Sequence, residues 1–247
     1  MEKFLMLGLI SAFCCGCNAQ TEKKYSTVDT YYEKNKGDSL PSQSTGTYSK
    51  GALINGKMMP FHGDNFTYFS ETSYLSGRAC VHSKVKTSVL ATYSKLAKLH
   101  PGRIFGLMEC SNKKGGKLWP HHTHQNGLSI DFMMPLLQNG KAYYELDDKG
   151  PDHYLLTFND KGQYIKDTTV SIDFNLVAQH ILLLDEQARK NGLHVKKVII
   201  KIELKDELYA TTFGKKLKAK GIYVVQALTP QINNIHDDHF HIDFDGL

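Results

Sequence analysis

The C-terminal stretch HDDHFHIDF, His236–Phe244, carries three histidines and three aspartates in nine residues. Successive side chains of a strand point to opposite faces, so this stretch would have two different faces. The polar face consists of His239, His241 and Asp243, and the apolar face consists of Phe240, Ile242 and Phe244. We expect the apolar face to anchor the strand in a core and the histidine face to bind a metal ion.

A second group of candidate ligands lies in the middle of the chain, in WPHHTHQNGLSIDF at 119–132, where six residues separate His124 from Asp131. If 128–132 forms a strand, Asp131 points away from its apolar neighbours and lies beside His241 in the sheet. His124 would then reach the same place from the preceding loop. Two nitrogen ligands and one oxygen ligand leave zinc a fourth position for water, which is typical of catalytic sites.

The rest of the chain predicts two long helices and several short strands. Apolar residues recur at helical spacing in KVKTSVLATYSKLAKLH at 84–100, before Pro101, and again between Asp173 and Gly192. Strand candidates lie at 103–109, 128–134, 154–158 paired with 162–165, 196–204, 222–228 and 239–244. We predict an α+β domain with a mainly antiparallel sheet and flanking helices.

The first nineteen residues are typical of an export signal, because Lys3 precedes a short apolar run and FCCGCNAQ follows it. The run is too short to span a membrane as a mature helix. Cleavage after Gly16 would leave Cys17 as the lipid-bearing first residue of a lipoprotein, whereas cleavage after Ala19 would release a soluble protein. The small residue before the cysteine favours lipidation, and we expect a periplasmic protein anchored to a membrane through Cys17.

The region that follows the signal, 20–57, is polar and rich in Ser, Thr, Gly and Lys, so we expect a tether and then a folded domain at 58–247. The net charge is +5 and the pI is near 8.8, which suits an acidic polymer as partner. No interleaved aromatic and basic motif is present, so we do not expect nucleic acid.

Two cysteines remain outside the signal, Cys80 and Cys110. An oxidising compartment favours their pairing, and we expect a disulfide between them. The alternative is a nucleophilic Cys80 with His82 nearby, although nothing else around it resembles a thiol protease.

The spacing His-x6-Asp, followed far downstream by His-x-His, resembles the zinc peptidases of the lysostaphin, D-Ala-D-Ala carboxypeptidase and sonic hedgehog (LAS) superfamily. Within that group, HHTHQNGLSID and HDDHFH are most similar to the penicillin-insensitive murein endopeptidases. The resemblance covers roughly 74–243 and implies a zinc peptidase domain with a LAS-type core. His-Glu-x-x-His, Gly-x-Ser-x-Gly and phosphate-binding glycine loops are absent from the sequence.

The resemblance implies one catalytic Zn²⁺ ion held by His124, Asp131 and His241. It makes His239 the general base or the stabiliser of the transition state, and it makes His236 a further active-site histidine.

Some members of that family have a second, weaker metal cluster, to which His121 would correspond. Its other members are missing at the family's spacing, although Asp152 and His153 lie nearby in the sequence, so we do not expect a second ion. Five other histidines lack such a context and are expected to be structural or exposed: His62, His82, His100, His180 and His194.

The resemblance points to peptidoglycan as the substrate and to cleavage of peptide cross-links between stems, at D-Ala-meso-diaminopimelate or at diaminopimelate-diaminopimelate bonds. The alternatives are a D,D- or L,D-carboxypeptidase that trims stem peptides, and a wall-binding or zinc-binding module without activity. Some relatives serve secretion machines, and the sequence leaves open a protein partner from a secretion machine or from wall synthesis.

Overall fold

The computed structural model describes residues 26–246. The expected export signal at 1–19, with the expected lipid site Cys17, lies outside the described residues. Within 26–246, no helix combines the length and the apolar character needed to cross a membrane.

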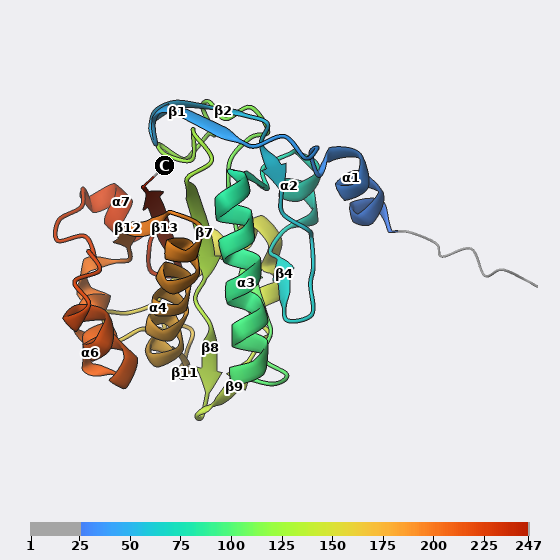
Figure 1. The fold of residues 1–247 in the computed structure, drawn as a ribbon. Helices are drawn as coiled ribbons and strands as arrows, with labels where there is room; N and C mark the ends of the chain where they lie inside the picture. The colour runs from blue at the N-terminus through green and yellow to red at the C-terminus, as the bar shows by residue number, and fades with distance from the viewer. Residues whose placement is uncertain (1–25, 247) are drawn as a thin grey trace, which may run out of the picture.

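The central element is a five-stranded sheet with the order β12-β13-β7-β6-β4 (Figure 1). Its strands are β4 (Phe66–Tyr68), β6 (Phe105–Leu107), β7 (Ser129–Met133), β12 (His194–Ile199) and β13 (His239–Asp245). Neighbouring strands are antiparallel except β4 and β6, which are parallel. The predicted α+β class with a mainly antiparallel sheet is confirmed, and the C-terminal stretch forms its second strand.

Two long helices, α3 (Ser83–Leu99) and α4 (Phe174–Lys190), lie side by side on one face of this sheet (Figure 1). His180 of α4 packs against Phe132 of β7 and Phe240 of β13, with ring centroids 4.8 and 5.5 Å apart. The helices therefore cover the apolar face of β7 and β13, which leaves the histidine face of β13 on the other side of the sheet.

The ends of both helices agree with the sequence prediction. The Asp173 side chain accepts a hydrogen bond from the backbone N–H of Leu176 and caps α4. α3 ends at Leu99, two residues before Pro101, which could not continue it.

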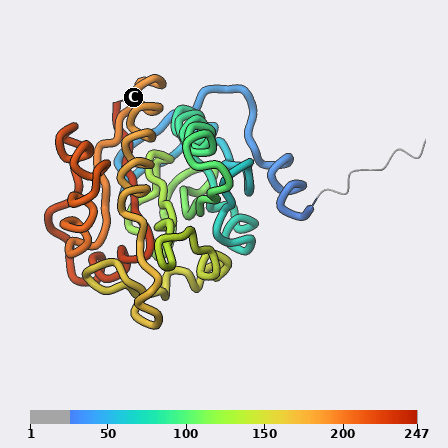
Figure 2. The backbone as a smooth tube through the Cα atoms, turned by 90° about the horizontal axis from the view of Figure 1, so that it is seen from below, coloured from blue at the N-terminus to red at the C-terminus, as the bar shows by residue number. Residues whose placement is uncertain are grey.

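Shorter helices surround this layer, and the N-terminal one lies at the edge of the molecule in both views (Figures 1 and 2). They are α1 (Thr27–Asn35), α2 (Glu71–Leu75), α5 (Lys205–Ala210), α6 (Thr212–Ala219), α7 (Pro230–Asn234) and the 3₁₀ helices η1 (Asp147–Leu155) and η2 (Ile202–Leu204). α6 packs against α4.

A second sheet has the order β10-β11-β8-β9. Its strands are β8 (Leu136–Gln138), β9 (Lys141–Tyr143), β10 (Gln163–Tyr164) and β11 (Asp167–Ile172). The predicted strand at 154–158 is wrong, because η1 extends to Leu155 and only Phe158 bridges to Tyr164. Gly150, with a φ of 55°, and Pro151 direct the chain into turns rather than into a ladder.

Other strand ends also differ from the sequence prediction. The predicted strand 196–204 stops at Ile199, and η2 follows. The predicted strand 222–228 supplies only one parallel bridge, between Val224 and Val198.

The region expected to be a polar tether, 20–57, is folded over most of its described part. Besides α1, it forms the hairpin of β1 (Gln43–Thr47) and β2 (Lys50–Ile54). The hairpin is attached through hydrogen bonds rather than a large apolar face, which is why a count of apolar residues missed it. Tyr48 donates its hydroxyl hydrogen to the carbonyl oxygen of Phe244 at 2.7 Å, and Ser44 donates to that of Asn126 at 2.6 Å.

The expected disulfide is absent, since Cys80 and Cys110 are both free and buried. Cys80 belongs to β5 (Cys80–Val81), which pairs with β3 (Lys57–Met58), and its partner on the other side is Ser111. Directly opposite residues share a face, and a shift by one residue changes the face. Cys110, one residue before Ser111, is therefore out of register with Cys80.

Candidate metal centre and active site

The register between β13 and β7 brings the two candidate motifs together. His241 lies directly opposite Asp131, as the sequence predicts, and its Nδ1 is 2.7 Å from Asp131 Oδ1. Both side chains are buried on the face that the helices leave free.

His124 reaches the same place from the loop before β7. Its Nε2 is 3.3 Å from Asp131 Oδ1 and 3.1 Å from His241 Nδ1. The loop is shaped for this approach, because His124 has a φ of 65°, a left-handed conformation that residues other than glycine rarely adopt. Gly127 follows with a φ of 75°, where a Cβ would lie only 2.7 Å from Leu53. Such strained conformations cluster at functional sites.

These three ligand atoms lie close enough together to share one metal ion. Ligand atoms about 2.0–2.1 Å from zinc lie about 3.4 Å from one another in a tetrahedron. The distances between His124 Nε2, Asp131 Oδ1 and His241 Nδ1 are 2.7 to 3.3 Å. Asp131 Oδ2 and His124 Nδ1 are buried and have no hydrogen-bond partner within 26–246. Buried polar atoms without partners are rare, and an ion bound here would supply one for the carboxylate.

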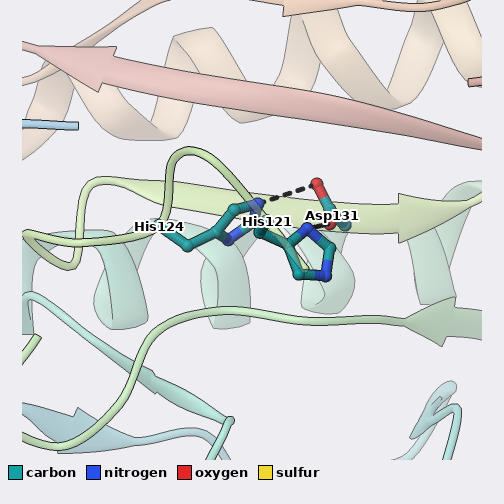
Figure 3. Close-up of side chains that lie close together, drawn as sticks. All are labelled: His121, His124 and Asp131. Carbon is teal, nitrogen blue, oxygen red and sulfur yellow. Dashed lines mark ion pairs between the residues drawn. The ribbon is translucent and has the colours of Figure 1, made fainter. Parts of the chain in front are cut away.

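His121 lies beside the same centre. Figure 3 shows His121 and His124 approaching Asp131 from the loop. The Nδ1 atom of His121 is 3.7 Å from Asp131 Oδ2, and one ligand atom from each of His121, His124 and Asp131 lies within 4.8 Å of the others. This group could hold a metal ion. Of the other second-cluster candidates, Asp152 is exposed, and the ring nitrogens of His153 face backbone carbonyl oxygens.

The electric field at the centre favours a positive charge. Burial alone would raise the pKa of the Asp131 carboxyl, but His124 and His241 outweigh burial and hold that pKa well below its ordinary value. Burial alone would lower the pKa of His241, but Asp243 and Asp131 outweigh burial and raise that pKa to about 9. A bound cation would supply the positive charge that these carboxylates stabilise.

His239 and His236 lie beside the candidate ligands. The Nδ1 atom of His239 contacts Asp238 Oδ1, which leaves the other ring nitrogen as the group able to exchange a proton. Asp238 therefore orients the His239 ring, whereas Asp237 accepts a hydrogen bond from the backbone N–H of Phe158 at 2.9 Å.

His236 is held from the opposite side by a backbone carbonyl. Its Nδ1 donates to the carbonyl oxygen of Ile232 at 2.6 Å, and its ring centroid is 4.8 Å from that of His239 and 6.5 Å from that of His241. Burial lowers the pKa of His236 to about 3. The ring is therefore neutral at physiological pH, with Nε2 as a hydrogen-bond acceptor.

These side chains open into a cavity of about 560 Å³. His121, His236, His239 and His241 line its polar part, and Trp119 and Ile235 line its apolar part. Trp119 is 85% exposed. A cavity of this size with a few convergent polar groups is typical of a substrate site.

Sequence reasoning missed a buried carboxylate next to this cavity. Glu109 accepts hydrogen bonds from Arg78 Nε and from Ser73 Oγ, at 2.7 Å each, and lies 3.2 Å from Nε2 of His121. Burial alone would raise the pKa of Glu109, but His121 and Arg78 outweigh burial and lower it. The only available signal was an acidic residue inside the apolar stretch FGLMEC.

Tyr154 was also missed. Its ring lies edge-on to His239 with centroids 5.1 Å apart, and its buried hydroxyl has no hydrogen-bond partner within the described residues.

Comparison with known protein families identifies the family of this chain. The family model for the penicillin-insensitive murein endopeptidases matches residues 44–245, a span that includes the hairpin β1-β2 except its first residue, the loop with His121 and His124, and all of β13. No curated protein matches the chain. Since the match covers more than half of the sequence, the chain belongs to the penicillin-insensitive murein endopeptidase family.

Proposed function

We propose that this protein is a zinc-dependent murein endopeptidase that cleaves peptide cross-links between stems. Family membership supports the murein endopeptidase activity. The observation that carries the zinc dependence is the convergence of His124 Nε2, Asp131 Oδ1 and His241 Nδ1 within 3.3 Å of one another.

His124, Asp131 and His241 would hold the ion, and His121 is close enough to Asp131 to take part. Bound zinc supplies a Lewis acid that polarises a carbonyl and lowers the pKa of water. Two nitrogens and one carboxylate oxygen are a donor set that zinc accepts readily.

His239 would move the proton. Asp238 holds Nδ1, so the other ring nitrogen takes a proton from the attacking water and passes it to the leaving amine. Asp238 would also stabilise the imidazolium that forms in between.

His236 would bind the substrate. Its carbonyl partner fixes the proton on Nδ1, and the neutral Nε2 accepts a hydrogen bond from a peptide N–H in the cavity.

The proposed bonds are D-Ala-meso-diaminopimelate or diaminopimelate-diaminopimelate cross-links, and the proposed location is the periplasm. The net charge of +5 suits the anionic wall polymer. The sequence FCCGCNAQ supports export and attachment to a membrane through Cys17.

A pair of purified muropeptides tests the reaction type. The zinc-loaded protein is incubated with a cross-linked dimer and, separately, with a monomer that carries a pentapeptide stem, and the products are resolved by mass. We expect the dimer to yield two monomers and the pentapeptide stem to stay intact. Loss of the terminal D-Ala from the monomer, with an intact dimer, would show a carboxypeptidase instead.

A further inference from the structure

Next to the candidate ligands, three polar side chains form a row across β12, β13 and β7. Lys197 pairs with Asp243, and Asp243 pairs with Ser129. Two residues away along β13, His241 pairs with Asp131. Residues two apart in a strand share a face, so this row lies directly beside the candidate metal centre.

Asp243 is the centre of the row and is fully buried. Its Oδ1 accepts a hydrogen bond from Ser129 Oγ at 2.6 Å and lies 2.8 Å from His241 Nε2. Its Oδ2 forms an ion pair with Lys197 Nζ at 2.7 Å.

These contacts decide which nitrogen of His241 carries hydrogen. A lysine ammonium group can only donate, and an ionised carboxylate can only accept. Asp243 therefore accepts from the ring, and Nε2 must carry the hydrogen. Without a metal ion, the same rule places hydrogen on Nδ1 as well, because Nδ1 lies 2.7 Å from the acceptor Asp131 Oδ1. A bound metal ion would take the place of that hydrogen, so that the Nδ1 lone pair faces the ion while Nε2 keeps its hydrogen toward Asp243.

We propose that Asp243 and Lys197 are positioning residues that fix His241 with its Nδ1 lone pair toward the metal ion. This inference rests on the proposed zinc site. A carboxylate behind a metal-binding histidine fixes the ring orientation, and removal of such a partner costs about 10-fold to 100-fold in metal affinity. Lys197 has a separate role. Its ammonium group can only donate, so the side chain at position 243 must direct an oxygen atom toward Lys197.

The neighbouring lysine provides a matched control. Lys196 and Lys197 both lie over the Tyr48 ring, with Nζ 5.8 and 5.9 Å from its centroid. Lys196, however, forms its ion pair with the partly exposed Asp245, whereas Asp243 forms its ion pair with Lys197.

The test compares zinc affinity of the wild-type protein, Asp243→Asn, Asp243→Asn/Lys197→Met and Asp243→Asn/Lys196→Met by competition with a chelator. In Asp243→Asn, the new side chain has only one oxygen atom, and Lys197 attracts it. The amide NH₂ group at position 243 therefore turns toward His241. The ring must then accept at Nε2 and place hydrogen on Nδ1. We expect zinc affinity to fall about 10-fold to 100-fold.

In the double variant with Lys197→Met, the amide oxygen is free to accept from His241 again. We expect this variant to recover most of the lost affinity, and the double variant with Lys196→Met to recover none. Long-range ¹H–¹⁵N spectra of the histidine rings give a second readout, with hydrogen on Nε2 of His241 in the wild type and no hydrogen on Nε2 in Asp243→Asn. The unfolding midpoint of each variant shows that it is folded, since none of them leaves a buried carboxylate without its partner.

Unchanged zinc affinity in Asp243→Asn, or equal recovery with either lysine substitution, would overturn the positioning role while leaving the zinc site intact. A wild-type protein that binds no zinc would overturn both the inference and the zinc dependence on which it rests.

Discussion

The buried imidazole of His180 should make the stability of this fold depend on pH. His180 is 2% exposed, lies among the rings of Phe105, Phe132 and Phe240, and has an Nε2 atom without a hydrogen-bond partner within 26–246. Burial lowers its pKa to about 3 from the ordinary value of 6.5.

Between these two pKa values, the unfolded chain binds a proton that the folded protein does not bind. The free energy of unfolding therefore falls as pH falls below 6.5, by about 1.4 kcal/mol per pH unit. Integrated from pH 7.5 to pH 5.0, the loss from this one group is about 2 kcal/mol. His180→Leu, which keeps a similar volume, should abolish that part of the loss.

The assay is urea unfolding at pH 7.5 and pH 5.0, in the presence of a chelator, followed by far-ultraviolet circular dichroism. The difference in free energy of unfolding between His180→Leu and the wild type should shift by about 2 kcal/mol in favour of the variant when the pH is lowered from 7.5 to 5.0. A relative stability of His180→Leu that is the same at both pH values would refute the reasoning.

Three further predictions concern the site and its supports. His239→Ala should keep bound zinc, measured by metal analysis, but lose about 10²-fold to 10⁴-fold in murein cleavage, whereas His241→Ala should lose both; near-wild-type turnover of His239→Ala would show that its role is wrongly assigned. Burial raises the pKa of Cys80 to about 11 and also raises the pKa of Cys110, so a thiol reagent should modify both residues only after unfolding. The intact mass should be the same with and without reductant, and a mass lower by two hydrogens before reduction would contradict the free thiols. Tyr48→Phe removes the hydrogen bond to Phe244 and should lower the free energy of unfolding by about 1 kcal/mol in urea titrations, while an unchanged midpoint would show that the hairpin contributes little through this bond.

The sequence predicted the parts of the site that depend on strand periodicity. The alternation in His236–Phe244 separates the histidine face from the apolar face, and pairing of two such strands places Asp131 beside His241. The apolar stripe of α4 and its Asp173 cap could also be predicted. The stripe depends on local spacing, and the cap depends on a single hydrogen bond.

The rest depended on contacts between distant segments. The ion pair between Arg78 and Glu109 joins residues whose separation in sequence carries no periodic signal. The hairpin β1-β2 has few apolar residues, and its attachment through Tyr48 and Ser44 depends on carbonyl groups that no sequence pattern reveals. The missing disulfide follows from a one-residue offset in register, which cysteine spacing cannot show.

Digestion of purified sacculi by the zinc-loaded protein, with a chelated sample and a chelated sample resupplied with zinc, tests the central claim most directly. We predict that cross-linked dimers decrease and monomers increase in the zinc-loaded sample, that chelation stops this, and that added zinc restores it. Equal digestion in the fully metal-depleted sample would contradict the zinc dependence, and intact dimers in all three samples would contradict the endopeptidase activity.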